Sequence, residues 1–277
     1  MTEQPSHGQY AIVNGLNIYY ETQGAGQPLL MLHGGFQTIE DLEPLRSLLA
    51  RNRRVVAADL EGHGHTADLD RPLTYEQMAE DFAGLIEQLG IAPADVLGFS
   101  MGGMVALRLA SKRPDLVRKL VAISAIYGND GYYPSTTKGW PDMSPQTLVG
   151  APFERVYKRV APHPERWPVL VEKAKHTLMD FNGWPPEDIR AIEAPALLAL
   201  GDADLVRPEY AVAMFRLLGG AREDGGMAGV PASQLAILPG TTHFSILSRV
   251  DLLAPIITSF LDAPMPEDDY SQMTTRA

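Results

Sequence analysis

The pentapeptide Gly98-Phe99-Ser100-Met101-Gly102 constrains the fold of this 277-residue chain more than any other stretch. A strand-like run, Asp95-Val96-Leu97, precedes it, and a helix of small and apolar residues follows from Gly103. A strand, a tight turn and a helix in direct succession hold the serine on a strained turn, where its hydroxyl projects away from the backbone. Glycines on both sides leave room for that turn. We therefore interpret Ser100 as a candidate nucleophile.

Apolar runs and helical patterns alternate along most of the chain. The runs typical of buried strands are 28–32, 54–58, 95–97, 119–123, 196–200 and 235–238, and 9–23 predicts two strands around a turn at Asn14-Gly15. Helical spacing of leucines appears at 39–50, and further helices are expected around 75–89, 208–218 and 253–261. This alternation indicates an α/β fold with a doubly wound, mainly parallel eight-stranded sheet.

Residues 128–194 interrupt the alternation. They are rich in Pro, Trp and Tyr, carry amphipathic patterns near 152–160 and 168–181, and contain no apolar strand. We interpret them as a helical cap inserted into a core domain of residues 1–127 and 195–264. The glycine-rich loop 219–232 is expected to be mobile, and residues 265–277 are expected to form a disordered acidic tail.

Composition excludes several classes of function. The formal net charge of −11 argues against binding to nucleic acids and to anionic membrane surfaces. The chain has no cysteine, which rules out disulfides, thiolate catalysis and cysteine metal sites. No apolar run approaches the roughly 20 residues of a membrane span, and the N-terminal residues do not resemble a signal peptide. We expect a cytoplasmic protein that acts on a small molecule; the oligomeric state stays open.

Polar residues gather where the expected strands end, which is where ligands bind in a parallel sheet. A serine hydroxyl needs a general base, usually a histidine that is oriented by a carboxylate. His243 follows the last strand and is the candidate base. Asp202 and Asp204 both follow the strand at 196–200, and Asp130 is a weaker third choice for the carboxylate.

The same strand ends supply candidate groups for binding the substrate. The backbone N–H of Met101 lies at a helix N-terminus and can face a developing negative charge. A second such donor is expected in the loop after 28–32, with Gly35 as first choice and Phe36 as reserve. We expect the side chains of Phe36, Tyr127 and Trp140 to contact the substrate. The histidines of the loop 59–66 are interpreted as parts of a tight structural loop and not as metal ligands.

Five motifs together resemble the α/β-hydrolase fold superfamily over about residues 9–262: His33-Gly34-Gly35, Asp59-x-x-Gly62-His63-Gly64, Gly98-x-Ser100-x-Gly102, Gly201-x-x-Asp204 and Gly240-x-x-His243. The order serine, acid, histidine is the one this family uses. The resemblance favours Asp204 as the acid, because the family places it three residues after the glycine. It also implies that His33 and the loop 59–66 support the oxyanion loop.

The resemblance implies a serine esterase-like member, that is, a hydrolase of the carboxylesterase type for small or medium apolar esters, working through an acyl-enzyme with neither a cofactor nor a metal. Epoxide hydrolases and haloalkane dehalogenases of the superfamily have aspartate where Ser100 stands. Proline iminopeptidases and many carbon–carbon bond hydrolases have Pro-Gly where Phe36-Gln37 stands. The spacing from Asp204 to His243 exceeds the family norm. Alternatives on the same triad are a lactonase, an amidase or a perhydrolase, and another is a ligand receptor with little turnover.

Overall fold

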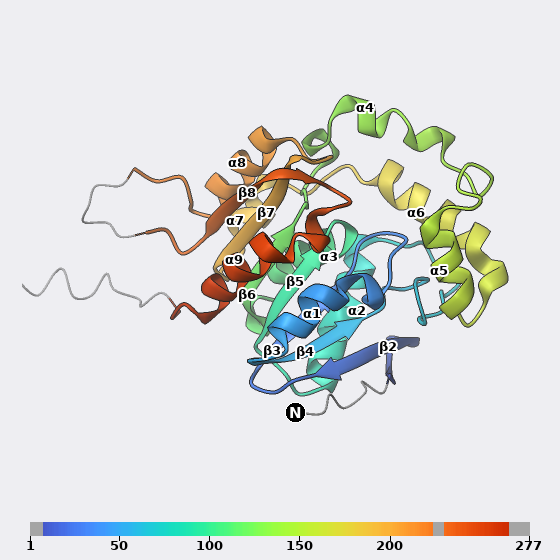
Figure 1. Cartoon of the computed structure of the whole chain (residues 1–277), viewed down its shortest axis with the longest axis horizontal. Helices are drawn as coiled ribbons and strands as arrows, with labels where there is room; N and C mark the ends of the chain where they lie inside the picture. The colour runs from blue at the N-terminus through green and yellow to red at the C-terminus, as the bar shows by residue number, and fades with distance from the viewer. Residues whose placement is uncertain (1–7, 224–229, 266–277) are drawn as a thin grey trace, which may run out of the picture.

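Eight strands form a single sheet with helices on both faces in the computed structural model, which describes residues 8–223 and 230–265 (Figure 1). The strands are β1 (Gln9–Val13), β2 (Leu16–Gln23), β3 (Gln27–Leu32), β4 (Arg53–Ala58), β5 (Ala94–Phe99), β6 (Val117–Ile123), β7 (Ala196–Ala203) and β8 (Gln234–Thr242). Their order is β1-β2-β4-β3-β5-β6-β7-β8. Only the pairs β1–β2 and β2–β4 are antiparallel, so the expected mainly parallel sheet is confirmed.

The two antiparallel strands at the amino-terminal edge are joined at Asn14-Gly15. Both residues have positive φ, 51° and 82°. A two-residue turn with this backbone matches the twist of the strands that it connects, and Asn-Gly is the pair that adopts it most readily. The hairpin prediction is confirmed by the register, in which Val13 lies opposite Leu16.

Each of the longer helices of the core follows a strand in the chain. They are α1 (Glu43–Leu49), α2 (Tyr75–Gln88), α3 (Met101–Lys112), α8 (Pro208–Leu217) and α9 (Val250–Asp262). The helix expected at 39–50 is divided, because a 3₁₀ turn, η1 (Ile39–Leu42), precedes α1. Further 3₁₀ turns are η2 (Pro114–Leu116), η3 (Asn129–Gly131), η4 (Trp140–Asp142), η5 (Pro164–Arg166) and η6 (Ile246–Ser248).

The sheet divides the hydrophobic core into two layers. On one face, α1 and α9 cover strand residues such as Leu29 and Met31. On the other face, α2, α3 and α8 cover Leu30 and Leu32. Consecutive residues of a strand point to opposite faces, so the continuous apolar run of β3 makes both faces of the sheet apolar there. Both faces must therefore be covered by helices, as they are in a doubly wound sheet.

Between β6 and β7 the described structure contains helices and 3₁₀ turns but no strand. An isolated bridge joins Tyr132 of this segment to Val206. The helices are α4 (Pro134–Thr137), α5 (Pro152–Val160), α6 (Trp167–Asp180) and α7 (Pro186–Arg190). In Figure 1, α4 lies at the top of the molecule and α5 and α6 lie at its right, beside the strands. Helix α7 instead packs on α3, where Arg108 pairs with Asp188. The division into core and cap at 128–194 stays a prediction.

The expectations for the loop 219–232 and for the tail 265–277 concern residues that the structure describes only in part. Residues 224–229 of the loop 219–232 and residues 266–277 of the tail lie outside the described residues. No helix in the described ranges is long and apolar enough to cross a membrane.

Candidate active site

Ser100 lies on the sharp turn between β5 and α3. Its backbone has φ 51° and ψ −117°, a conformation that is uncommon for a residue with a side chain. Its N–H donates to the carbonyl of Ile123 over 2.8 Å, and the N–H of Gly102 donates to the carbonyl of His33 over 3.1 Å. The turn is thereby fastened to the strands on either side of β5.

The two glycines of the motif are required by close backbone contacts. A Cβ on Gly98 would lie 2.1 Å from the carbonyl oxygen of Gly102. A Cβ on Gly102 would lie 2.4 Å from the carbonyl oxygen of His33. No side chain fits at either distance, so the turn holds Ser100 in place only with glycine at both positions.

Three side chains from the ends of three strands meet above the sheet. The Oγ of Ser100 is 3.1 Å from Nε2 of His243, and Nδ1 of His243 is 2.8 Å from Oδ1 of Asp204. Both His243 and Asp204 are buried. This arrangement allows the histidine to accept the serine proton while the carboxylate orients the ring and stabilises its cationic form.

The surroundings of Asp204 keep its carboxylate charged. Burial by itself raises the pKa, but the hydrogen bond and charge of His243 and the hydrogen bonds from Ser124 and Gly201 outweigh it, so the pKa of Asp204 is lowered. The Ser124 hydroxyl donates to Oδ2 over 2.6 Å, and the Gly201 N–H donates over 3.1 Å. An ionised Asp204 accepts a hydrogen bond from the Nδ1–H of His243, which leaves Nε2 without a proton and able to accept a hydrogen bond from the Ser100 hydroxyl.

The two other carboxylates that the sequence left open lie elsewhere. Asp202 is exposed and accepts from the N–H groups of Gly240 and Thr241, in the turn that leads to His243. Asp130 belongs to η3, where its carbonyl accepts a hydrogen bond from Arg207. The geometry therefore brings Asp204 alone of these three to His243.

Ser124 is a residue of this site that the sequence analysis missed. It follows β6 directly, has φ 51° and is almost fully buried. Its N–H donates to the carbonyl of Ala199 over 2.7 Å, which fixes it beside β7. The signal that could have found it is its position, because it is the polar residue at the carboxyl end of another parallel strand.

The two residues expected to supply the oxyanion donors, Gly35 and Met101, are neighbours in space. A Cβ built on Gly35 would be 3.2 Å from the Cε of Met101, so the loop after β3 passes directly over the start of α3. Within the described residues no hydrogen bond engages the N–H of Gly35 or of Met101. Phe36, the reserve choice, has φ 62° and lines the same space. Backbone N–H groups without a partner are the donors that an oxyanion hole uses, so Gly35 and Met101 stay the predicted donors.

Buried polar side chains support this loop from below. Nδ1 of His33 donates to the Gly34 carbonyl over 2.7 Å, and its Nε2 accepts from the N–H of Leu60 over 3.1 Å. Burial lowers the pKa of His33 despite the nearby charge of Asp59, so the ring is neutral and can accept that bond. The loop is thus tied to the end of β4.

The loop 59–66 is a network around one buried carboxylate. Asp59 accepts from the N–H of Ile39 over 2.9 Å and from the N–H of His65 over 2.8 Å. Nδ1 of His65 lies 3.0 Å from the same carboxylate, and Nδ1 of His63 lies 2.9 Å from the carbonyl of Glu61. Within residues 8–223 and 230–265, no three His, Cys, Asp or Glu side chains are grouped so that they could hold a metal ion.

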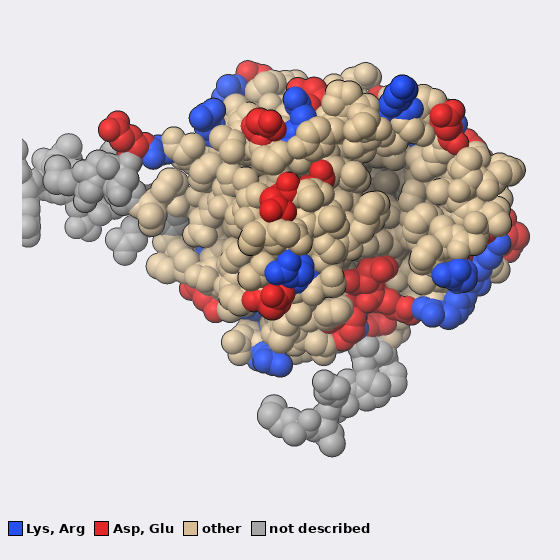
Figure 2. Space-filling model, turned by 45° about the horizontal axis from the view of Figure 1, so that its top comes forward, with Lys and Arg blue, Asp and Glu red and all other residues tan. Residues whose placement is uncertain are grey.

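Two cavities adjoin Ser100 and His243. The first, of about 210 Å³, is mostly apolar and is lined by Gly35, Phe36, Tyr75, Ser100, Met101, Tyr132, Thr136, Trp140, Met143, Ala174, Leu178, Leu205, His243 and Phe244. We call it the catalytic cavity. The second, of about 200 Å³, is lined by Gly35, Phe36, Gln37, Asp41, Phe99, Ser100, Pro152, Phe153, Val156, His243 and Phe244. The face seen in Figure 2 is largely uncharged, and it is hollowed between its left and right parts.

The aromatic residues expected to contact substrate are divided by the structure. Phe36 and Trp140 line the catalytic cavity. Tyr127 lines neither cavity; its ring stacks on that of Tyr210 at a centroid distance of 5.0 Å. Tyr75 and the exposed Phe244 line the catalytic cavity without having been expected there. They come from α2 and from the residue after His243, and sequence spacing does not reveal that both turn toward Ser100.

Comparison with known proteins gives the family. The model of the alpha/beta hydrolase family matches residues 29–256. A soluble epoxide hydrolase of Corynebacterium sp. is 35% identical over 131 residues, which are 46% of this chain and 44% of that enzyme. The putative carbamate hydrolase RutD of Azorhizobium caulinodans is 26% identical over 223 residues, 73% of this chain and 82% of that protein. The chain thus matches less than half the length of some curated relatives.

Solved structures agree on the fold. The thermophilic esterase from Thermogutta terrifontis superposes with a TM-score of 0.71 at 22% sequence identity, covering 92% of this chain and 98% of that one. At this identity the likeness concerns the fold alone. Because the family model covers most of the sheet and all five motifs, the chain belongs to the alpha/beta hydrolase family.

Proposed function

We propose that this hydrolase cleaves carboxylic esters of small or medium apolar substrates through an acyl-enzyme intermediate. The observation that carries the proposal is the chain of contacts from Ser100 Oγ to His243 Nε2 and from His243 Nδ1 to Asp204, at 3.1 and 2.8 Å, beside an apolar cavity. A nucleophile, a base and an orienting acid within hydrogen-bond reach of one another are the requirements for acyl transfer.

The reaction then runs in two steps. Ser100 Oγ attacks the ester carbonyl while His243 Nε2 takes its proton, and the oxyanion accepts hydrogen bonds from the Gly35 and Met101 N–H groups. The intermediate collapses, His243 gives its proton to the departing alcohol, and the acyl group stays on Ser100. Water then attacks the acyl-enzyme with His243 as base, which releases the acid and restores the serine. The chain's own residues suffice, so no cofactor is required.

Relatives support hydrolysis in general, and the ester bond is our specific choice. The nucleophile position carries serine, whereas the resemblance expects aspartate there in epoxide hydrolases. The uncharged lining of the catalytic cavity favours a neutral apolar substrate, because burying a charge without a partner is costly.

The test is hydrolysis of p-nitrophenyl esters from acetate to decanoate, combined with labelling by a fluorophosphonate probe. Ser100→Ala should lose on the order of 10⁶ in kcat and should not be labelled. Ser111→Ala, on the same helix but away from the site, should match the wild type. If the wild type is labelled yet cleaves none of these esters, the acyl-transfer site stands and the simple ester is wrong, so lactones and amides are tested next. A wild type that is neither labelled nor active contradicts the proposal and favours a receptor.

A further inference from the structure

Tyr75, the first residue of α2, lies between two hollows. It lines the catalytic cavity and also a separate hollow of about 290 Å³, whose other walls include Thr74, Phe181 and Trp184. We call this second space the outer hollow. Neither Ser100 nor His243 lines it. Because Tyr75 lines both spaces and is itself only 1% exposed, it forms part of the wall between them.

Helix α6 runs beside both hollows. Ala174 and Leu178 line the catalytic cavity, and Thr177 and Phe181, at its C-terminal end, line the outer hollow. Ala174 and Leu178, four residues apart, lie on one face of the helix. Thr177 lies beside Leu178 on the adjoining face, and Phe181 follows the end of α6. The two spaces are therefore adjacent along the same helix, with Tyr75 facing them from α2.

Packing alone holds the ring of Tyr75 in the described structure. Its edge meets Phe181 at a centroid distance of 4.9 Å and Trp184 at 6.1 Å, with interplanar angles of 76° and 80°. Its buried hydroxyl has no hydrogen-bond partner. Removing this side chain would thus leave no buried polar group unpaired, and would remove part of the wall.

We propose that Tyr75 determines specificity by ending the space available to the apolar chain of the ester. This inference rests on the proposed function. Each methylene buried in an apolar cavity contributes about 0.8 kcal/mol, which is about a fourfold gain in kcat/KM. Once the apolar chain of the ester reaches Tyr75, a further methylene no longer raises kcat/KM, because it meets a filled, close-packed wall. Without the ring, a longer chain extends into the outer hollow.

The experiment measures kcat/KM for p-nitrophenyl esters from acetate to dodecanoate with the wild type, Tyr75→Phe, Tyr75→Leu and Tyr75→Ala. A parallel series of alkyl butyrates, followed by pH-stat, tells whether the chain that meets Tyr75 belongs to the acid or to the alcohol. Active-site titration with the fluorophosphonate and the thermal midpoint show that each variant is folded. If Tyr75→Ala does not fold, Tyr75→Leu takes its place in the comparison, because it also removes the ring.

The expected result is a gain that misfolding cannot produce. In the wild type kcat/KM should rise about fourfold per methylene and then level off or fall. We call the chain length at which this happens the limit. In either the p-nitrophenyl ester series or the alkyl butyrate series, Tyr75→Ala should move the limit to chains several carbons longer and raise kcat/KM for the longest esters at least tenfold. Tyr75→Phe should keep the wild-type limit, because it retains the ring.

Three results would overturn the inference. One is a folded, titratable Tyr75→Ala or Tyr75→Leu with an unchanged limit in both series. Another is a limit that moves as far in Tyr75→Phe as in Tyr75→Ala, which would assign specificity to the hydroxyl. Both leave the proposed function standing, because the wild type is active. A wild type that cleaves no ester of either series overturns the proposed function and this inference together.

Discussion

At the scale of single residues, the site depends on one ionised carboxylate. Asp204 is buried, which disfavours its charge, yet hydrogen bonds from His243, Ser124 and Gly201 lower its pKa. Those same bonds fix the position of both carboxylate oxygens. The chemistry we propose for Ser100 therefore depends on a histidine whose tautomer and orientation are set by Asp204.

Two neighbouring aspartates allow this role to be tested with a matched control. Asp204→Asn should lower kcat by about 10⁴, because the amide favours the wrong histidine tautomer. Asp202→Asn should change kcat less than tenfold, since Asp202 is exposed and bonds only the turn at Gly240 and Thr241. Steady-state kinetics of both variants on the best ester measures this. Equal losses in the two variants would contradict the assignment of the acid.

Ser124 should act as a positioning residue. Its hydroxyl donates to Asp204 over 2.6 Å, and hydrogen bonds to charged groups contribute about 1.5–3 kcal/mol. We expect Ser124→Ala to lower kcat by about tenfold with little change in KM, because Ser124 lines neither cavity. An unchanged kcat, or a loss confined to KM, would show that Asp204 is held without it.

At the scale of elements, the junction of β5 and α3 places the serine. The two elements approach so closely that a Cβ on Gly98 would lie 2.1 Å from a backbone oxygen of Gly102. Close-packed interiors do not absorb such an overlap without moving backbone. The position of Ser100 is thus a consequence of how two elements pack.

We expect Gly98→Ala to destabilise the protein by about 1–3 kcal/mol or more and to lower kcat/KM at least 10²-fold, through displacement of Ser100. The control is Gly139→Ala, where the added Cβ would come no nearer than 3.9 Å to Thr136 and φ is ordinary. That variant should stay within about 0.5 kcal/mol of the wild type. Urea unfolding and ester kinetics measure both effects. A Gly98→Ala protein with wild-type stability would refute the steric account.

At the scale of the whole molecule, buried neutral histidines couple folding to pH. Burial and the neighbouring His33 lower the pKa of His63 to about 3, and burial lowers the pKa of His33 as well. The unfolded chain, whose histidines titrate near 6.5, binds more protons than the folded one below that pH. Stability should therefore fall as pH drops from 6.5 toward 3.

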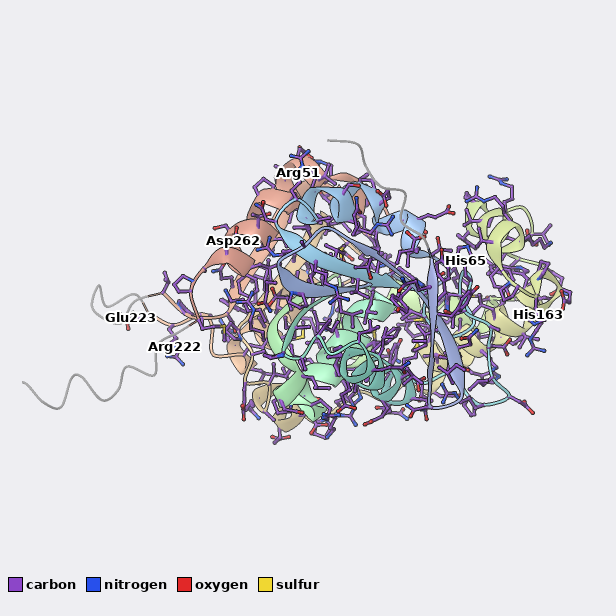
Figure 3. The ribbon with its side chains drawn as sticks, turned by 90° about the horizontal axis from the view of Figure 1, so that it is seen from below. Arg51, His65, His163, Arg222, Glu223 and Asp262 are labelled. Atoms are coloured by element: carbon purple, nitrogen blue, oxygen red, sulfur yellow. The ribbon has the colours of Figure 1, made fainter. Side chains whose placement is uncertain are left out.

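The expected slope is about 1.4 kcal/mol per pH unit for each such histidine. The hydrogen bond to Asp59 raises the pKa of His65, so His65 has the opposite sign, but only above about pH 6.5. Urea unfolding at pH 7, 6 and 5 should show a smaller slope in His63→Gln than in the wild type. His163→Gln should keep the wild-type slope, because the side chain of His163 is exposed at the right-hand end of the molecule in Figure 3. Equal slopes in all three proteins would contradict this account.

Much of the fold can be predicted from residues that are neighbours in the chain. Continuous apolar runs identified the parallel strands, and Asn14-Gly15 identified the hairpin, because each depends on residues that are neighbours in the chain. The motif around Ser100 also specifies its own turn. Helix boundaries were less well determined: the helix expected at 39–50 begins as a 3₁₀ turn.

Which polar groups meet at the site depends on contacts between residues that are far apart in the chain. Asp202 and Asp204 follow the same apolar run, and the family resemblance favours Asp204 by its spacing from Gly201. In the structure Asp204 contacts His243, whereas Asp202 bonds the turn at Gly240. Ser124 is marked in the sequence only by its position at the end of a strand, and its partner Asp204 is 80 positions away in the chain. Tyr75 has no such mark, because its position in the cavity wall depends on contacts with distant residues such as Phe181. Tyr127, an aromatic residue like Trp140, packs on Tyr210 outside the cavities. Residues that are neighbours in the chain thus suffice to predict the strands and the turn at Ser100, because strand and turn preferences are local. The contact of Asp204 with His243 and the shape of the catalytic cavity arise instead from side chains that meet only in the folded chain.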